Sequence, residues 1–248
     1  MIRCYVEPEQ WRCGEIELAN GEAGHLARVL RARAGDEVIV FDGRGASAAA
    51  RILSAGRGRV VVSIDPASRR EDPPPAVAVT LMQAVPKPQS FEWILQKAGE
   101  LGACAIVPVL SERVVWRAGR ADADARRERW RAIAIGAAKQ CGNNRIPEIA
   151  PAARLSDLLP ILRQYELCLV GALRPGARPM REALAETRGA APKSVALLVG
   201  PEGDFTPREL DAAVAAGARP VSFGPRVLRS ETAALFGLSA LLCEFGGR

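Results

Sequence analysis

The 248-residue chain has little of several residue types on which common kinds of site depend. It contains one histidine, His25, which excludes a metal site with several histidines and leaves a serine–histidine–aspartate triad only that residue. No two of the six cysteines have C-x-x-C spacing, so neither a zinc site nor a dithiol redox motif is expected. No G-x-x-x-x-G-K-[ST] segment occurs, which argues against a P-loop nucleotidase. We therefore expect no bound metal.

The chain also lacks a long apolar run. Its longest mainly apolar segment, residues 232–245, is interrupted by Gly237 and Glu244 and is short for a membrane span. The first residues lack the basic flank and apolar stretch of a signal peptide. A hydrophobic content of 48% and a charged content of 25% are typical of soluble globular proteins. We expect a cytoplasmic protein with no membrane partner.

Positive charge is present in excess. The formal net charge of +6, which comes almost wholly from arginine, fits a polyanionic partner such as a nucleic acid. The chain is also rich in alanine, glycine and proline, and the base composition of a genome can produce this pattern as well. Charge alone therefore leaves nucleic-acid binding open.

A polar and then proline-rich segment, residues 68–75, separates two patterns and indicates an interdomain linker. Before it, short β-rich runs are joined by glycine turns, which predicts a small β-barrel over residues 1–70. The expected strands lie at residues 15–18, 37–41, 48–53 and 59–64, with one helix at 22–33. After it, strands and helices alternate over residues 76–248, which predicts a parallel sheet flanked by helices.

Apolar runs and capping signals set the expected elements of the second part. Strands are expected at residues 77–85, 105–110, 167–173, 195–199 and 220–223. Helices are expected at residues 90–101, 123–140, 155–162, 181–186, 206–216 and 230–242. Ser90 and Ser230 are the expected N-caps of their helices. Thr206 and Glu209 form a capping box, with Pro207 at the first helical position.

Two short loops at expected strand ends carry most of the chemistry. Gly200-Pro201-Glu202-Gly203 places a carboxylate between two glycines, and residues 223–232 place Arg226 and Arg229 before a helix. Glycine lets a ligand approach the backbone closely, and ligands of parallel sheets bind beyond the carboxyl ends of the strands. The pair Val227-Leu228 offers an apolar slot that suits an adenine ring. A tight turn with a solvated glutamate is the alternative interpretation of the first loop.

Residues 43–48 match G-x-G-x-x-A, the pattern of a dinucleotide-binding fingerprint. That fingerprint needs a strand before it and a helix after it. Here another strand is expected to follow, so we interpret Gly43 as part of a hairpin turn.

Basic residues outside the two loops are candidates for contact with RNA. On helical spacing, Arg28 and Arg31 share a face of the expected helix around His25, with Arg33 near its end. That face is either a phosphate-contacting strip or a solvated surface. Lys87 and Lys97 either face a substrate groove or merely decorate the surface.

The end of the expected helix at 123–140 offers a further arginine. Gly142, with two asparagines after it, is typical of a helix C-cap and turn. Arg145 then either pairs with a phosphate or a carboxylate, or holds the turn in place, and the structural role is favoured.

The chain resembles the RsmE family of 16S ribosomal RNA uridine-N3 methyltransferases, which belong to the SPOUT class. The resemblance extends over nearly the whole chain, and the two loops are its most specific part. Its other segments lie at residues 25–31, 35–36, 41–43, 96–102, 108, 111–113, 130–134, 139–141 and 145–149. Asp204 stands where many members carry glycine, and Ser230 stands where many carry threonine.

The resemblance implies an α/β SPOUT fold, a trefoil-knotted parallel sheet with helices on both faces. It implies that residues 76–248 form this catalytic domain and that residues 1–70 form a PUA-like RNA-binding β-barrel. It further implies S-adenosyl-L-methionine as the cofactor and a homodimer. The implied substrate is a uridine in the decoding region of 16S rRNA, within the small ribosomal subunit.

Individual roles are expected from this resemblance together with the chemistry of methyl transfer. The expected cofactor-binding residues are Leu173, Gly200, Pro201, Glu202, Gly203, Phe223, Gly224, Val227, Leu228, Arg229 and Thr232. The expected RNA-binding residues are His25, Arg28, Arg31, Arg33, Lys87, Lys97 and Arg145. Arg229 or Arg226 is expected to stabilise the uracil anion that forms when N3 loses its proton, and Glu202 or solvent to accept that proton. Two alternatives stay open: a SPOUT enzyme acting on another RNA or a ribose 2′-hydroxyl, and a non-catalytic RNA-binding assembly factor.

Overall fold

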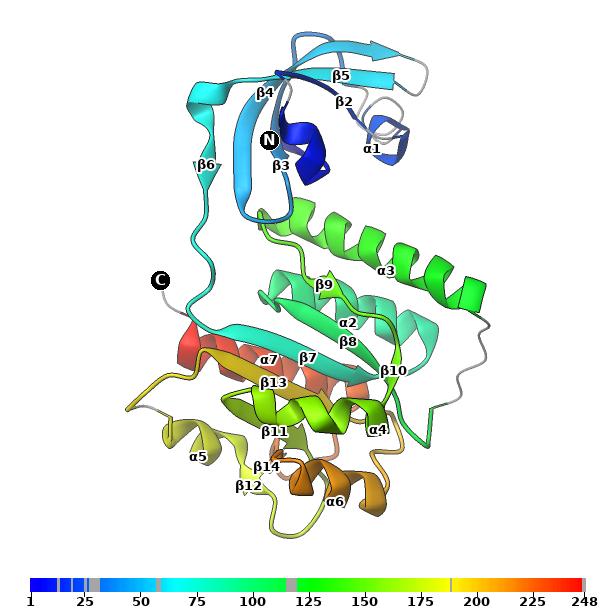
Figure 1. Cartoon of the computed structure of the whole chain (residues 1–248), viewed down its shortest axis with the longest axis vertical. Coiled ribbons are helices and arrows are strands. Elements are labelled where there is room, and N and C mark those ends of the chain that lie inside the picture. The colour runs from blue at the N-terminus through cyan, green and yellow to red at the C-terminus, as the bar shows by residue number, and fades with distance from the viewer. Residues whose placement is uncertain are drawn as a thin grey trace. The chain divides into compact units, whose positions relative to one another are not determined.

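The computed structural model describes residues 1–12, 14–18, 20–24, 26, 32–56, 59–114, 120–187 and 189–246 (Figure 1). The chain divides into two compact units. The first comprises residues 1–74 and 135–146, and the second comprises residues 75–134 and 147–248. Residues 135–146, which the sequence assigns to the second domain, therefore group with the first unit. His25, Arg28 and Arg31 lie outside the described residues.

A six-stranded sheet forms the first unit. Its strands are β1 (Ile2–Tyr5), β2 (Glu15–Glu17), β3 (Glu37–Phe41), β4 (Ala46–Gly56), β5 (Arg59–Ile64) and β6 (Arg70–Glu71). The order is β1-β3-β4-β5-β2, with β6 on β4; β1 is parallel to β3 and the other pairs are antiparallel. Its short helices are η1 (Pro8–Arg12), α1 (Asn20–Gly24) and η3 (Pro66–Ser68).

The strands expected at residues 37–41 and 59–64 are confirmed, since β-branched residues there alternate between buried and partly exposed positions. Gly43 has a φ of 74° in the connection between antiparallel strands β3 and β4, which confirms the hairpin turn. The expected linker at 68–75 is wrong in its first half. Arg70 and Glu71 pair with β4, and the Asp72 N–H donates to the Gly45 carbonyl at 3.0 Å.

The turn after the long helix α3 (Arg120–Cys141) is anchored in the first unit by hydrogen bonds. Asn144 is 8% exposed; its amide donates to Ser47 Oγ at 3.1 Å and to Asp72 Oδ2 at 2.8 Å. The Ile146 N–H donates to the Gly43 carbonyl at 2.9 Å. Gly142, with a φ of 82°, supplies the left-handed conformation that ends the helix. These contacts explain why residues 135–146 group with the first unit.

The second unit contains an eight-stranded sheet whose described pairings are all parallel. Its strands are β7 (Ala78–Ala84), β8 (Ala105–Leu110), β9 (Glu148–Ile149), β10 (Ala153–Arg154), β11 (Leu167–Gly171), β12 (Arg178–Pro179), β13 (Ser194–Val199) and β14 (Arg219–Ser222). The order is β10-β8-β7-β13-β11-β14-β12, with β9 on β8. All carboxyl ends therefore lie along one edge of the sheet.

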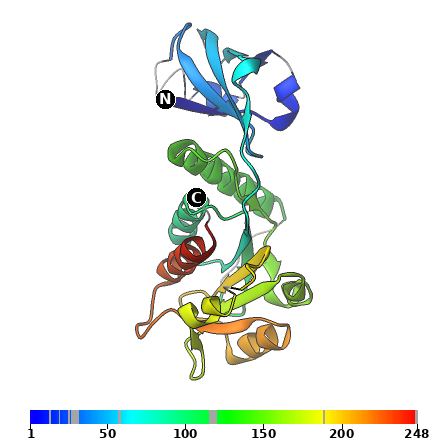
Figure 2. The ribbon, with the colours of Figure 1, turned by 90° about the vertical axis from the view of Figure 1, so that its left-hand side faces the viewer.

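Helices cover both faces of this sheet, as Figure 2 shows with the sheet nearly edge-on. Besides α3, the helices are α2 (Pro88–Glu100), α4 (Leu155–Leu158), η4 (Leu159–Gln164), α5 (Met180–Ala185), α6 (Pro207–Ala215) and α7 (Ser230–Phe245). Helices α2 and α7 pack together, and α7 contacts β7 and β13. Residues of α4, η4 and α6 share one buried cluster with alternate strand residues such as Met82 and Leu198. This arrangement confirms the expected α/β class.

The C-terminal chain takes an unusual course. Strand β14 lies beyond β11, yet the helix that follows it returns to β13 and β7 near the middle of the sheet. There a β-carbon on Gly237 would lie 2.6 Å from Leu197 Cδ2, so the absence of a side chain lets α7 approach the sheet closely. The knotted path implied by the resemblance falls in this return.

Two of the expected helix caps are wrong. Helix α2 begins at Pro88, whose fixed φ suits a first helical position, and its N-cap is Lys87 instead of Ser90. Helix α7 has Arg229 as its N-cap because the Ser230 hydroxyl bonds another loop. The Thr206–Glu209 capping box of α6 is confirmed. The helix expected at 155–162 is instead α4 followed by η4, since Pro160 cannot donate a helical hydrogen bond.

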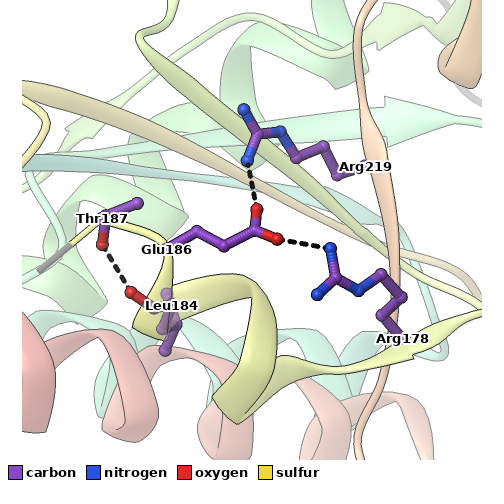
Figure 3. A network of polar contacts seen from close by, with 5 residues as sticks. All are labelled: Arg178, Leu184, Glu186, Thr187 and Arg219. Carbon is purple, nitrogen blue, oxygen red and sulfur yellow. Dashed lines mark hydrogen bonds and ion pairs between the residues drawn. The ribbon is translucent and has the colours of Figure 1, made fainter.

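An exposed ion-pair network ties β12, β14 and the end of α5 (Figure 3). Glu186 accepts from Arg178 at 2.5 Å and from Arg219 at 3.3 Å. The hydrogen bond and charge of Arg178 lower the pKa of Glu186. These two arginines are therefore engaged within the protein.

None of the described helices combines the length and apolar composition that a membrane crossing requires. Within the described ranges, no three histidine, cysteine, aspartate or glutamate side chains gather into a group suited to a metal ion.

Candidate functional site

A cavity opens at the carboxyl edge of the parallel sheet, beside β11, β13 and β14. Loops after these three strands form its walls, so the two loops singled out from the sequence meet in space. The lining residues are Gly171, Ala172, Leu173, Val199, Gly200, Pro201, Glu202, Asp204, Phe223, Gly224, Arg226, Val227, Leu228, Ser230 and Ala233. The apolar Leu173 and Val227 are 60% and 75% exposed, so the mouth presents uncovered apolar surface to a ligand.

Close packing explains the glycines of this site. A β-carbon on Gly200 would lie 2.7 Å from Asp204 Oδ1 and 3.0 Å from the Phe205 nitrogen, closer than real contacts permit. A β-carbon on Gly171 would lie 2.7 Å from the ring of Phe223. Missing side chains thus bring the three loops together and expose backbone to the cavity.

Asp204 joins two of the loops. Its Oδ1 accepts from the Phe205 N–H at 2.8 Å, and its Oδ2 accepts from the Leu173 N–H at 3.3 Å. Among the described residues, it is the one non-glycine residue with a positive φ, at 60°. This left-handed conformation favours glycine over a residue with a side chain, so Asp204 carries backbone strain.

Gln83 and Ser230 join the two principal loops beneath the cavity. The Ser230 hydroxyl donates to the Gly200 carbonyl at 2.6 Å, and the Gln83 amide donates to Ser230 Oγ at 2.9 Å. Both residues are buried. Gln83 Oε1 is also buried and has no hydrogen-bond partner within the described part of the chain. Sequence reasoning missed Gln83 because its one signal is a polar residue near the end of an apolar strand.

The structure separates the three proposed catalytic residues. Glu202 and Arg226 line the cavity, and both are exposed. Arg229 is exposed as well but does not line the cavity; it caps α7 through its backbone. Neither arginine makes an ion pair with another described residue. Arg226 is therefore the cation that the fold brings to the cavity.

Eight of the expected cofactor residues line the cavity and three do not. Gly203 lies outside it, with its carbonyl accepting from Arg113, and Thr232 is exposed on α7. Arg229 is the third. The lining residues that the sequence did not indicate are Gly171, Ala172, Val199, Asp204, Ser230 and Ala233. These residues adjoin the predicted segments in the chain. The sequence did not reveal which neighbours of those segments face the cavity.

The described candidates for RNA contact differ in their exposure and in whether their side chains already have partners within the protein. Arg33 and Lys87 are exposed. Lys97 is half-buried and pairs with Glu100 at 2.7 Å. The Arg145 guanidinium donates to the Asp72 carbonyl at 2.6 Å within the first unit. For Arg145 this geometry supports the structural role that the sequence favoured.

Comparison with known proteins places this geometry in a family. Residues 73–242 match the family of RNA methyltransferase domains, and residues 18–65 match the family of RNA methyltransferase PUA domains. Ribosomal RNA small subunit methyltransferase E of Bacillus subtilis is 30% identical, over 97% of this chain and 96% of its own. The protein of the same name from Mycobacterium bovis is 34% identical, over 92% of this chain and 86% of its own.

Solved structures agree. A putative methyltransferase from Legionella pneumophila, in complex with bound S-adenosylmethionine, is 32% identical with a TM-score of 0.88, covering 98% of this chain and 97% of its own. Ribosomal RNA small subunit methyltransferase E of Neisseria gonorrhoeae, bound to S-adenosylmethionine, is 29% identical with a TM-score of 0.84, covering 98% and 97%. The expected SPOUT fold with a PUA-like N-terminal domain is confirmed. The chain belongs to the ribosomal RNA small subunit methyltransferase E family.

Proposed function

We propose that the protein transfers a methyl group from S-adenosyl-L-methionine to N3 of a uridine in the decoding region of 16S rRNA, within the small ribosomal subunit. The observation that carries this proposal is the cavity in which the two loops meet at the carboxyl edge of the sheet. Membership of the family supports the substrate class, and its relatives with bound S-adenosylmethionine support the cofactor.

The residues at the cavity fit this cofactor. Gly200 and Gly224 leave backbone open to close approach, and Leu173, Val227 and Leu228 provide an apolar surface for the adenine ring. Glu202 and Asp204 add carboxylates at the wall, which suit a ligand that carries positive charge. The cofactor, when bound, supplies an electrophilic methyl group on a sulfonium.

Arg226 is the residue that we assign to the uracil. Transfer to N3 requires loss of the imide proton, which leaves negative charge on N3 and the adjacent carbonyl oxygens. A guanidinium at the cavity wall stabilises that charge through charge-assisted hydrogen bonds. Glu202 lines the same cavity and is the candidate acceptor of the proton, with solvent as the alternative.

The base reaches the cavity only when unpaired, since N3 lies on its pairing edge. We assign the PUA-like first unit, with its exposed Arg33, to RNA binding outside the cavity.

We also propose a homodimer and a cytoplasmic location. Helix α7 exposes the large apolar side chains Phe236 and Leu242, each at 44%, and α2 exposes Trp93 at 43%. Exposed apolar surface of this kind marks interfaces. Light scattering at several protein concentrations tests the dimer, and a monomer at all of them would contradict it.

The function is tested with purified small ribosomal subunits that lack the modification. The subunits are incubated with the protein and isotopically labelled S-adenosylmethionine, and their nucleosides are analysed by mass spectrometry. We expect labelled 3-methyluridine, mapped to one nucleotide of the decoding region. The control variant is Glu186→Gln, which changes the exposed ion-pair network and none of the cavity residues, and its turnover should equal that of the wild type.

Other products would replace the proposal. A ribose-methylated nucleoside would indicate transfer to a 2′-hydroxyl. Methylation of another RNA would change the substrate. Absence of both methylation and S-adenosylmethionine binding at millimolar concentration would indicate a non-catalytic assembly factor.

A further inference from the structure

A second cavity, of about 530 Å³, lies at the same carboxyl edge of the sheet. Its walls come from the end of β8 and the loop after it, from the start of α4 and η4, and from the first turns of α6. The lining residues are Leu110, Ser111, Glu112, Val114, Arg154, Leu155, Ser156, Leu159, Arg208, Glu209 and Ala212. The proposed reaction uses none of them.

Unpaired positive charge gathers along this edge. Among the described residues of the second unit, five arginines have no hydrogen bond or ion pair through the guanidinium: Arg154, Arg181, Arg208, Arg226 and Arg229. Each stands at the carboxyl end of a strand or in the loop or first helical turn that follows one. Arginines near the opposite edge are engaged, since Arg163 donates to the Ala215 carbonyl and Arg219 pairs with Glu186.

Two of the five unpaired arginines, Arg154 and Arg208, lie at the second cavity. Both are exposed, so they are free to meet an anion there. The Glu209 carboxylate is occupied by other donors and pairs with neither arginine: it accepts from the Glu112 N–H at 2.8 Å and from the N–H and hydroxyl of Thr206 at 2.9 and 3.1 Å. Its charge is thus held by three donors inside the protein.

The wall also carries groups suited to a base. Val114, Leu155, Leu159 and Ala212 form apolar surface, and the exposed Glu112 carboxylate can accept from a base N–H. Ser111 is 7% exposed, and its hydroxyl has no hydrogen-bond partner within the described ranges. A buried hydroxyl without a partner is unfavourable, so a ligand that engages it after rotation of the side chain is favoured.

The two cavities are connected through one segment. Gly200, Pro201, Glu202 and Asp204 line the first cavity, and Arg208 and Glu209, a few residues on, line the second. Arg113, in the loop after β8, donates to the Gly203 carbonyl between them. The two cavities therefore open along one edge of the sheet, on either side of this segment.

We propose that the second cavity is a nucleotide subsite for the RNA substrate. It takes a nucleotide near the methylated one, with the phosphate on Arg154 and Arg208 and the base against Leu155, Leu159 and Glu112. The cations at the rim match the phosphate, and the apolar wall and the free acceptor match the face and the N–H edge of the base. This inference rests on the proposed function, because it names a second contact of the same substrate.

The test compares Arg154→Gln, Arg208→Gln and the double variant with wild type. Arg219→Gln is the matched control, an exposed arginine near the opposite edge whose surface ion pair contributes little. Each protein is assayed for S-adenosylmethionine affinity by calorimetry and for methylation of unmodified small subunits over a series of salt concentrations.

We expect the double variant to raise the KM for subunits about tenfold while its affinity for S-adenosylmethionine stays at the wild-type value. Loss of each phosphate contact should also reduce the slope of log affinity against log salt by about 0.7. Glu112→Ala should raise KM without changing that slope, because it removes an acceptor for the base rather than a cation. Photo-crosslinking of bound subunits should label residues 110–114 or 154–159.

The outcomes separate this inference from the function itself. Wild-type KM and salt slope in the folded double variant, together with crosslinks confined to other segments, would overturn the subsite while methylation stands. Failure of wild type to methylate the subunits would remove the proposed function first. A double variant with reduced S-adenosylmethionine affinity would overturn the subsite too, because these arginines would then act on the first cavity.

Discussion

The Ser230 hydroxyl donates a 2.6 Å hydrogen bond to the Gly200 carbonyl. The bond spans 30 residues of sequence and links the start of α7 to the loop after β13, so the two loops of the cavity are held as one structure. The Gln83 amide completes the link from the centre of the sheet. This small buried network positions the backbone that the proposed cofactor contacts.

Ser230→Ala should therefore destabilise the fold and weaken S-adenosylmethionine binding. It removes a buried hydrogen bond and leaves polar groups unsatisfied, at a cost of about 1–3 kcal/mol. Ser230→Thr keeps the hydroxyl and should retain affinity. Chemical denaturation and calorimetry measure both effects, and equal affinities for the alanine and threonine variants would contradict the linking role.

Gly200→Ala should abolish cofactor binding, because the added methyl group meets Asp204 and the Phe205 backbone at 3.0 Å or less. The loop must shift to accept it. Gly136→Ala is the control: Gly136 lies in α3, its β-carbon would meet nothing within 4 Å, and the change should stabilise the protein by about 0.5–1 kcal/mol. Calorimetry with S-adenosylmethionine decides, and wild-type affinity for Gly200→Ala would show that the loop adapts freely.

Substitutions of Asp204 separate backbone strain from hydrogen bonding. Asp204→Gly suits the φ of 60° but loses the bond to the Leu173 N–H, whereas Asp204→Ala loses the bond and also places a β-carbon in a left-handed conformation. We expect the alanine variant to be about 1–2 kcal/mol less stable than the glycine variant. Urea denaturation of both gives the difference, and an alanine variant of equal stability would refute the strain.

Arg226→Ala should reduce kcat by about 10²–10³-fold with little change in S-adenosylmethionine affinity, as expected when a group that stabilises developing charge is removed. Arg229→Ala should have a smaller effect, because Arg229 does not line the cavity. Single-turnover methylation of small subunits measures both. If Arg229→Ala is the more damaging variant, the assignment between the two arginines is reversed.

Burial predicts which of the cysteine thiols react with an alkylating reagent. Burial raises the pKa of Cys4 and of Cys168 to about 12, so both stay protonated when a solvent-exposed thiol ionises. At pH 8, iodoacetamide should label the exposed Cys141 and Cys243 and spare Cys4 and Cys168. Peptide mass spectrometry reads the labels, with the protein in denaturant as the control in which all react.

The raised pKa values of these two thiols also predict how the free energy of unfolding depends on pH. The thiols ionise in the unfolded chain at their ordinary pKa, near 8.5, but not in the folded one. Their contribution is complete below that pH and is lost as the pH rises toward about 12. The free energy of unfolding should therefore fall between about pH 9 and pH 11, and a constant value would contradict the burial of these thiols.

Much of the fold could be predicted from local patterns. The strands at residues 37–41, 59–64 and 105–110 were predicted with the bounds that the structure has, since each is an apolar run between turn residues. Strand β1 and the two-residue strands β6, β9, β10 and β12 could not be predicted, because pairing with distant partners alone makes them strands. The predicted N-caps of α2 and α7 were wrong for a related reason, since a serine near a helix start has other partners available.

The sequence by itself determined the α/β alternation, the two glycine loops and the resemblance to the family, because these depend on local patterns and on the residues of short motifs. The tertiary structure alone decided which groups meet. It brought Arg226 to the cavity and left Arg229 at a cap, drew Gln83 and Asp204 into the site, and used Arg145 inside the first unit. Those outcomes depend on strand order and loop packing, which join residues far apart in the chain and leave no periodic signal in it.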